Sequence, residues 1–183
     1  MPCLLESIDQ IKQARALMGS IKQLIQQELE DGMDPWWFIS FHYNDGKTNE
    51  DQVIQDMADL KNKLKRVIYK ARDRSVKGEG LFPYPKMLVM NEVSHLGTGQ
   101  FHSHLITEAF PESLNSQRMM ELLFKRILPS KVKALSRWKS IDVQRIHQDP
   151  EVLKKLASYL GKQVDLDYVA LDGLNSDFSK EER

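Results

Sequence analysis

The spacing of apolar residues along the chain predicts a mixed order of helices and strands. Four segments have apolar positions at three- and four-residue steps, as amphipathic helices do: residues 4–30, 50–74, 113–135 and 150–163. Shorter β-prone segments predict four strands, at residues 36–43, 86–93, 101–110 and 138–147, and "DYVAL" near the C-terminus predicts a short fifth one. The predicted order is therefore helix, strand, helix, strand, strand, helix, strand, helix.

This order predicts an α+β fold, with an antiparallel sheet and helices mainly on one face. Its central part, β-α-β-β-α-β, is the ferredoxin-like pattern, and the open face of such a sheet is the expected place for an active site. A chain of 183 residues fits one domain. We expect residues 1–34 to form an N-terminal helical extension, residues 35–170 the core, and residues 171–183 an acidic tail.

Composition narrows the class of protein. Apolar residues make up 41% of the chain and charged residues 28%, which is typical of a globular protein. Cys3 is the only cysteine, so an intramolecular disulfide is excluded. The sequence has neither the long apolar stretch of a membrane span nor the apolar core of a signal peptide. We therefore expect a cytoplasmic protein without a membrane partner.

Charge is unevenly distributed, although 26 basic and 26 acidic residues cancel. Basic side chains concentrate at residues 61–77 and 118–139, whereas acids gather in the first 60 residues and after Val164. A polyanion responds to local potential, so we expect these stretches to bind nucleic acid. The candidate DNA-binding residues are Lys61, Lys65, Arg66, Lys70, Arg72, Arg74, Lys125, Arg126, Lys131 and Lys133.

The segment "EVSHLGTGQFHSHLITE", residues 92–108, carries a candidate metal site. Alternate residues of a strand share a face, so His102 and His104 project together. Glu92 lies across the expected hairpin, and two imidazoles with a carboxylate suit a divalent cation whose identity the ligands leave open. His95, in the turn, is the alternative third ligand, whereas His42 is interpreted as structural or near DNA.

A candidate nucleophile lies in "SYLGKQ", on the last predicted helix. Lys162 and Gln163 follow Tyr159 by three and four residues, so all three can share one helical face. A phenolate can attack a phosphorus atom and form a covalent intermediate. Lys162 would then stabilise charge near the phosphate, and Gln163 is a further candidate metal ligand.

These motifs together resemble the HUH endonuclease superfamily, and within it the replication initiators of rolling-circle plasmids and small single-stranded DNA viruses. The resemblance spans residues 36–165, with "WFISFHY" as the first motif, "HSH" as the second and "YLGK" as the third. It implies Mn²⁺ or Mg²⁺ as cofactor, a 5′-phosphotyrosine intermediate on Tyr159 and a free 3′-OH that primes replication. The implied partners are single-stranded DNA at an origin, an adjacent hairpin and a helicase. Ser103 departs from the family pattern, which has an apolar residue between the histidines.

Two other functions fit the same residues. The first is a single-tyrosine transposase or a relaxase of the same superfamily; Gln163 is available as the metal ligand that such transposases place one turn after the tyrosine. The second is a non-catalytic DNA-binding domain with a structural metal.

Overall fold

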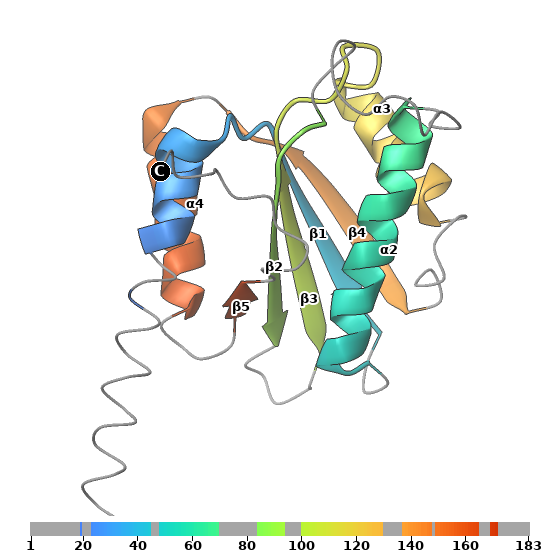
Figure 1. Cartoon of the computed structure of the whole chain (residues 1–183), viewed down its shortest axis with the longest axis horizontal. Coiled ribbons are helices and arrows are strands. Elements are labelled where there is room, and N and C mark those ends of the chain that lie inside the picture. Colours follow the sequence, from blue (N-terminus) through green and yellow to red (C-terminus); the bar gives the residue numbers. More distant parts are fainter. Residues whose placement is uncertain are drawn as a thin grey trace, which may run out of the picture.

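The computed structural model describes residues 19, 23–44, 48–69, 84–93, 100–129, 137–147, 149–164 and 169–171, with only the backbone for residues 31, 68, 69, 93, 161–164 and 169–171. These residues form an α+β fold in which an antiparallel sheet lies between two layers of helices (Figure 1). This arrangement confirms the predicted α+β class. Within the described ranges, no helix is long and apolar enough to cross a membrane.

The elements follow the predicted order. Residues 23–27 are helical and continue into the π-helical turn η1 (Glu28–Gly32). The other elements are β1 (Trp37–Tyr43), α2 (Glu50–Tyr69), β2 (Met87–Val93), β3 (Phe101–Thr107), α3 (Gln117–Leu122), the π-helical turn η2 (Leu123–Ile127), β4 (Trp138–Arg145), α4 (Pro150–Val164) and β5 (Val169–Leu171). The acidic tail and most of the N-terminal extension lie outside the described residues.

Local side-chain caps fix where two helices begin. The Asn49 side chain accepts a hydrogen bond from the Gln52 amide at 2.9 Å, at the start of α2. The Asp149 side chain accepts one from the Glu151 amide at 2.8 Å, and Pro150 occupies the first turn of α4. Both caps satisfy backbone N–H groups that a helix leaves without a partner, so the sequence alone sets these boundaries.

The sheet has the strand order β4-β1-β3-β2-β5, and every neighbouring pair is antiparallel. Strand β1 is thus an interior strand, between β4 and β3, although it comes first along the chain. It pairs His42 with His102 of β3 on one side and with Ser140 of β4 on the other. Because side chains alternate between faces, this register determines which residues of distant segments meet.

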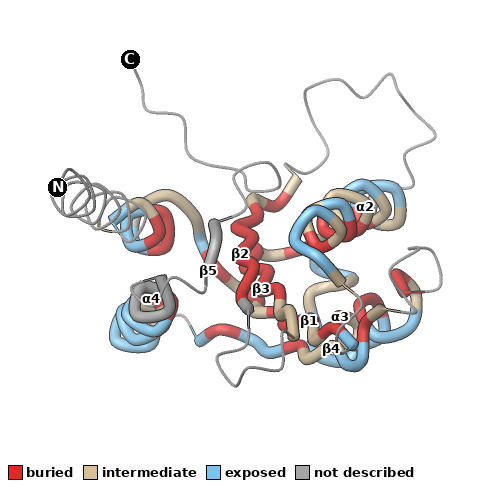
Figure 2. The backbone as a smooth tube through the Cα atoms, turned by 90° about the horizontal axis from the view of Figure 1, so that it is seen from below, coloured by how far each residue is buried: buried red, intermediate tan, exposed pale blue. Residues whose placement is uncertain are grey.

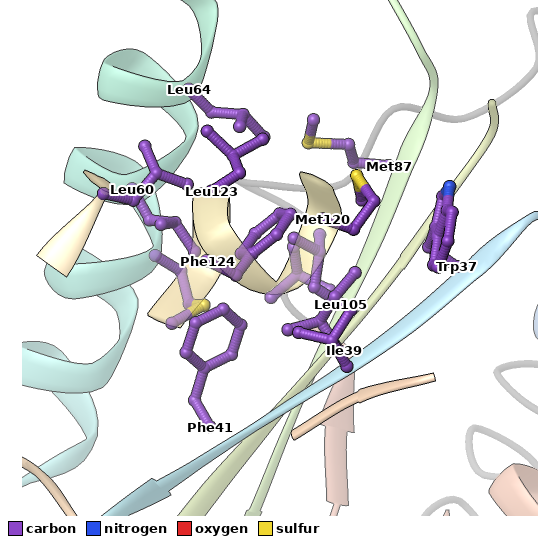
Figure 3. Packing of buried hydrophobic residues seen from close by; sticks show 14 of the residues in the cluster. Trp37, Ile39, Phe41, Leu60, Leu64, Met87, Leu105, Met120, Leu123 and Phe124 are labelled. Atoms are coloured by element: carbon purple, nitrogen blue, oxygen red, sulfur yellow. The ribbon is translucent and has the colours of Figure 1, made fainter. Parts of the chain in front are cut away.

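One face of the sheet is covered by α2, α3 and η2. Figure 3 shows the buried side chains that this layer packs together, with Phe41 of β1 near Phe124 of η2. The odd-numbered residues of β1 belong to this core: Trp37, Ile39, Phe41 and Tyr43. An ion pair also holds the layer, because Arg137 donates through Nε to Oδ2 of the buried Asp56 at 2.8 Å and through a terminal nitrogen to Oδ1. This joins α2 to the residue before β4.

The second face is covered in part, by α4 and the helical segment at residues 23–32 (Figure 2). Leu160 of α4 and Ile25 are both fully buried in a cluster that includes Met90 and Ile106 of the sheet. The prediction that helices lie mainly on one face is therefore correct only in part. The reason is that β2 and β3 carry apolar residues on both faces, and both faces need cover.

A candidate active site on the second sheet face

Polar and titratable side chains gather on the second face, at strand positions outside the apolar cluster that α4 and residues 23–32 pack against. In the strand register, Glu92, His102 and His42 form one row across β2, β3 and β1. His104 and Ser40 are paired in the adjacent row. The structure thus brings Glu92, His102 and His104 together on three neighbouring strand positions, and their binding of a metal stays a prediction.

His104 is held from three sides. Its side chain is buried, and its Nδ1 lies 3.0 Å from Oγ of Ser40 while its Nε2 lies 3.1 Å from Oε2 of Glu92. The ring of Phe38 stacks on the imidazole, with centroids 5.1 Å apart and planes 15° from parallel. In the neutral tautomer that carries its proton on Nε2, Nε2–H donates to the Glu92 carboxylate and Nδ1 accepts from the Ser40 hydroxyl. These contacts fix the ring before any ligand binds.

His102 and His42 are less buried and lie edge to face. Their ring centroids are 4.6 Å apart and their planes meet at 66°. Burial is the main cause that lowers the pKa of both imidazoles, and the mutual repulsion of the clustered histidines lowers it further. Asp142 of β4 and Glu92 act in the opposite direction on the pKa of His42. Both imidazoles therefore favour the neutral form, in which one nitrogen can bind a metal.

The spacing of His104 and Glu92 fits a shared cation. Two ligand atoms about 2.1 Å from one ion and 3.1 Å from each other subtend an angle of about 95°, which is within the range of protein metal sites. As they stand, no three His, Cys, Asp or Glu side chains among the described residues form a group that could hold a metal ion. Metal binding at this pair, which stays a prediction, would need a third ligand to move towards it, and His102, directly across from Glu92, is the nearest in register.

Tyr159 lies on the same face, on the exposed side of α4. Its side chain is 50% exposed and lines a groove of about 290 Å³. Phe38 lines the same groove, and its ring stacks on that of His104. Lys162 and Gln163 follow on α4, but their side chains lie outside the described part of the structure, as does the whole of His95.

Five of the ten predicted DNA-binding residues are described, and they lie on the opposite layer. Lys61, Lys65 and Arg66 belong to α2, and Lys125 and Arg126 belong to η2. These elements cover the face of the sheet that the histidines do not occupy (Figure 2). The remaining candidates, Lys70, Arg72, Arg74, Lys131 and Lys133, fall in segments that the structure does not describe.

Two of these lysines have local partners. Nζ of Lys65 lies 4.5 Å from the centre of the Tyr84 ring, and Nζ of Lys125 lies 3.4 Å from a carboxylate oxygen of Glu121. The described basic residues thus lie on the layer that does not contain Tyr159.

Sequence reasoning missed the contributions of β1 to the site. His42 was interpreted as structural or near DNA, yet the structure places it against His102. Ser40, two residues earlier on the same face, bonds to His104. The two-residue repeat of a strand places Ser40 and His42 on one face of β1. Only the pairing of β1 with β3 shows that this face meets His102 and His104.

Ser103 does not disturb the core as its polarity suggests. It is fully buried on the face covered by α2 and donates a hydrogen bond to Oδ1 of Asn91 at 2.7 Å. A buried hydroxyl with a partner costs little. The departure from the family pattern is thus accommodated by a polar residue on the neighbouring strand.

Comparisons with known proteins identify no relative. No protein-family model matches the chain, and neither a curated protein nor a solved structure matches it. Function is therefore inferred from the residues and their arrangement.

Proposed function

We propose that the protein nicks and rejoins single-stranded DNA at an origin of rolling-circle replication, as an HUH-type initiator of a plasmid or small virus. The observation that carries the proposal is the bond between His104 and Glu92 on the sheet face whose groove contains Tyr159. The strand order β4-β1-β3-β2 supports a ferredoxin-like core, which the resemblance to this superfamily implies.

In this proposal each side chain has one role. A bound divalent ion, held by Glu92, His102 and His104, would polarise the non-bridging oxygens of the scissile phosphate. The phenolic oxygen of Tyr159 forms a bond to phosphorus, the bond to the 3′ oxygen breaks, and the phenolic proton leaves as the 3′-OH is released. Lys162 stabilises the charge on the phosphate. Rejoining reverses these steps and frees the tyrosine.

The position of Tyr159 agrees with this role. Leu160 next to it is fully buried, which anchors this turn of α4 on the sheet, while the phenol remains half exposed. An attacking group needs a fixed backbone and an accessible oxygen, since well-oriented reactants account for much of enzymatic rate acceleration.

The basic residues of α2 and η2 would contact a different part of the DNA. They lie on the other side of the sheet from Tyr159, so a hairpin beside the nicked strand fits them better than the strand in the groove. Phosphate contacts of this kind contribute affinity without sequence specificity.

The test is a covalent adduct. The protein is incubated with pooled single-stranded oligonucleotides and Mn²⁺, and the adduct is mapped by mass spectrometry. We expect a 5′-phosphate on Tyr159 and an oligonucleotide with a 3′-OH that a polymerase extends. Tyr159→Phe should abolish the adduct, whereas Tyr84→Phe, on the opposite layer, should leave it unchanged. Nicking that persists in Tyr159→Phe, or an adduct on Tyr84, contradicts the proposal.

A further inference from the structure

The groove between α4 and the end of β4 has features that the proposed nicking reaction does not use. Its volume is about 290 Å³, and besides Tyr159 it is lined by Phe38 of β1, Gln144 and Arg145 of β4, and Leu156 of α4. Ligand pockets in proteins start at about 300 Å³ and combine an apolar lining with a few polar groups that fix the orientation of the ligand. The groove therefore has the size and the mixed lining of a site for one small group.

Phe38 gives this groove an aromatic surface whose orientation is already fixed. Its ring stacks on the buried imidazole of His104, with centroids 5.1 Å apart and planes 15° from parallel. On α4, the exposed side chains of Val152 and Tyr159 line the groove at helical spacing, with Leu156 between them. A planar apolar group would cover this surface, and aromatic side chains are the usual stacking platform for the bases of single-stranded nucleic acid.

Arg145 places a positive charge at the same groove. Its guanidinium carbon lies 4.9 Å from the centre of the Trp36 ring. Stacking on an aromatic face leaves the N–H groups of a guanidinium able to bond in their own plane, where they suit phosphate oxygens. None of the described residues that line the groove carries a carboxylate. An aromatic surface beside a cation therefore favours a nucleotide, with its base against Phe38 and its phosphate at Arg145.

Gln144 presents its amide to the groove in a fixed orientation. Its Nε2 donates a hydrogen bond to Oδ2 of Asp142 at 2.5 Å. An ionised carboxylate only accepts, so the nitrogen faces Asp142, and Oε1 and the second N–H remain for a ligand. An acceptor beside a donor matches an amino group beside a ring nitrogen, and adenine carries this pair on both of its edges, at N6 with N7 and at N6 with N1.

We propose that the groove is a base-binding subsite for adenine in single-stranded DNA, in which Gln144 determines the base, Phe38 supplies the stacking surface and Arg145 holds the phosphate. Because Tyr159 lines the same groove, the adenine would belong to a nucleotide next to the one that is cleaved. This inference takes its substrate class from the proposed function but requires neither a metal ion nor cleavage.

Binding without cleavage tests the subsite. The full chain in EDTA is titrated into fluorescently labelled oligo-dA, oligo-dC and oligo-dT, each about twelve nucleotides long, and anisotropy gives the three values of Kd. Gln144 is exposed, so Gln144→Leu should fold. Gln55→Leu is the matched control, because Gln55 is also exposed and its Nε2 also donates to an aspartate, Asp59, but on α2 in the opposite layer. Thermal unfolding verifies that each variant folds, and Phe38→Met replaces Phe38→Leu if the latter does not.

We expect oligo-dA to bind about tenfold more tightly than oligo-dC or oligo-dT. Gln144→Leu should abolish this preference, whereas Gln55→Leu should leave it unchanged. Phe38→Leu should weaken the binding of all three strands by about tenfold, because it removes the stacking surface.

Two results would overturn the subsite and leave the proposed nuclease intact: a preference for adenine that survives in Gln144→Leu, or equal binding of the three strands by the original protein, as expected if the groove takes a peptide instead. A protein that binds none of the strands overturns the subsite together with the DNA substrate of the proposed function. An adenine preference that depends on Gln144, without any adduct on Tyr159, supports the subsite and overturns only the cleavage.

Discussion

His102 and His104 are two residues apart, but we expect their replacement by alanine to affect the metal-free protein very differently. His104 is 6% exposed and has close contacts with Ser40, Glu92 and Phe38. His102 is less buried, and its ring packs edge to face against His42. A role in metal binding alone would make the two histidines equivalent, whereas these surroundings make them unequal.

The interactions of each ring give the size of the difference. The bond to Ser40 contributes about 1 kcal/mol, the bond to the Glu92 carboxylate about 1.5–3 kcal/mol, and the stack with Phe38 about 0.5–1.5 kcal/mol. His104→Ala should therefore lower the free energy of unfolding by about 3–5 kcal/mol. His102→Ala removes one edge-to-face ring interaction, which is worth about 1 kcal/mol.

Urea denaturation in EDTA measures this difference directly. For a chain of this length, 1 kcal/mol corresponds to a shift of about 2–4 °C in Tm. Thermal melting should therefore place His104→Ala about 10 °C below the original protein and His102→Ala within about 4 °C of it. Ser40→Ala is the matched control and should lower the free energy of unfolding by about 1 kcal/mol, because it removes only the hydrogen bond to Nδ1. Equal destabilisation by the two histidine variants would refute the reasoning, since the three partners of His104 would then contribute no more than the single ring contact of His102.

Three further predictions test the supporting structure. Leu160→Ala should lower the free energy of unfolding by about 2–5 kcal/mol and reduce adduct formation, because it removes the buried anchor of α4; unchanged urea denaturation would contradict this. Asp56→Ala should cost about 3 kcal/mol by leaving Arg137 without its buried partner, and a double-mutant cycle with Arg137→Ala should show coupling rather than additivity. Lys125→Glu together with Arg126→Glu should reduce the dependence of log K on log salt by about 0.7 for each phosphate that the protein no longer neutralises; an unchanged slope in a binding titration would exclude η2 from the DNA surface.

Local patterns in the amino-acid sequence are enough to predict the elements and much of their boundaries. Apolar spacing located the four main strands and both long helices, since burial requires one apolar face on each. The caps at Asn49 and Asp149 are local interactions, so they follow from the residues alone. The predicted helix at 113–135 is different, because α3 passes into the wider turn η2 at Leu123, shortly before Pro129. The spacing of apolar residues along the sequence does not distinguish α-helical from π-helical turns.

Strand parity also predicted that His102 and His104 share a face, because this depends only on the two-residue repeat of a strand. Which residues lie beside His102 and His104 on that face depends on the strand order. The order β4-β1-β3-β2 places His42 and Ser40 beside the two histidines, although β1 and β3 are far apart in the chain. No periodicity within one segment contains that information.

Tertiary packing sets where the charges and the nucleophile lie. The apolar stripes of α2 and η2 are buried against the odd-numbered residues of β1. The orientation of these stripes determines on which side of the sheet the basic residues of the same helices lie. They are thereby fixed on the layer opposite the histidines. Leu160 of α4 instead packs against the second face, so Tyr159 lies on the histidine side. Sequence sets which face of a helix is apolar, but only the competition among helices for the two faces of one sheet sets which side that helix covers.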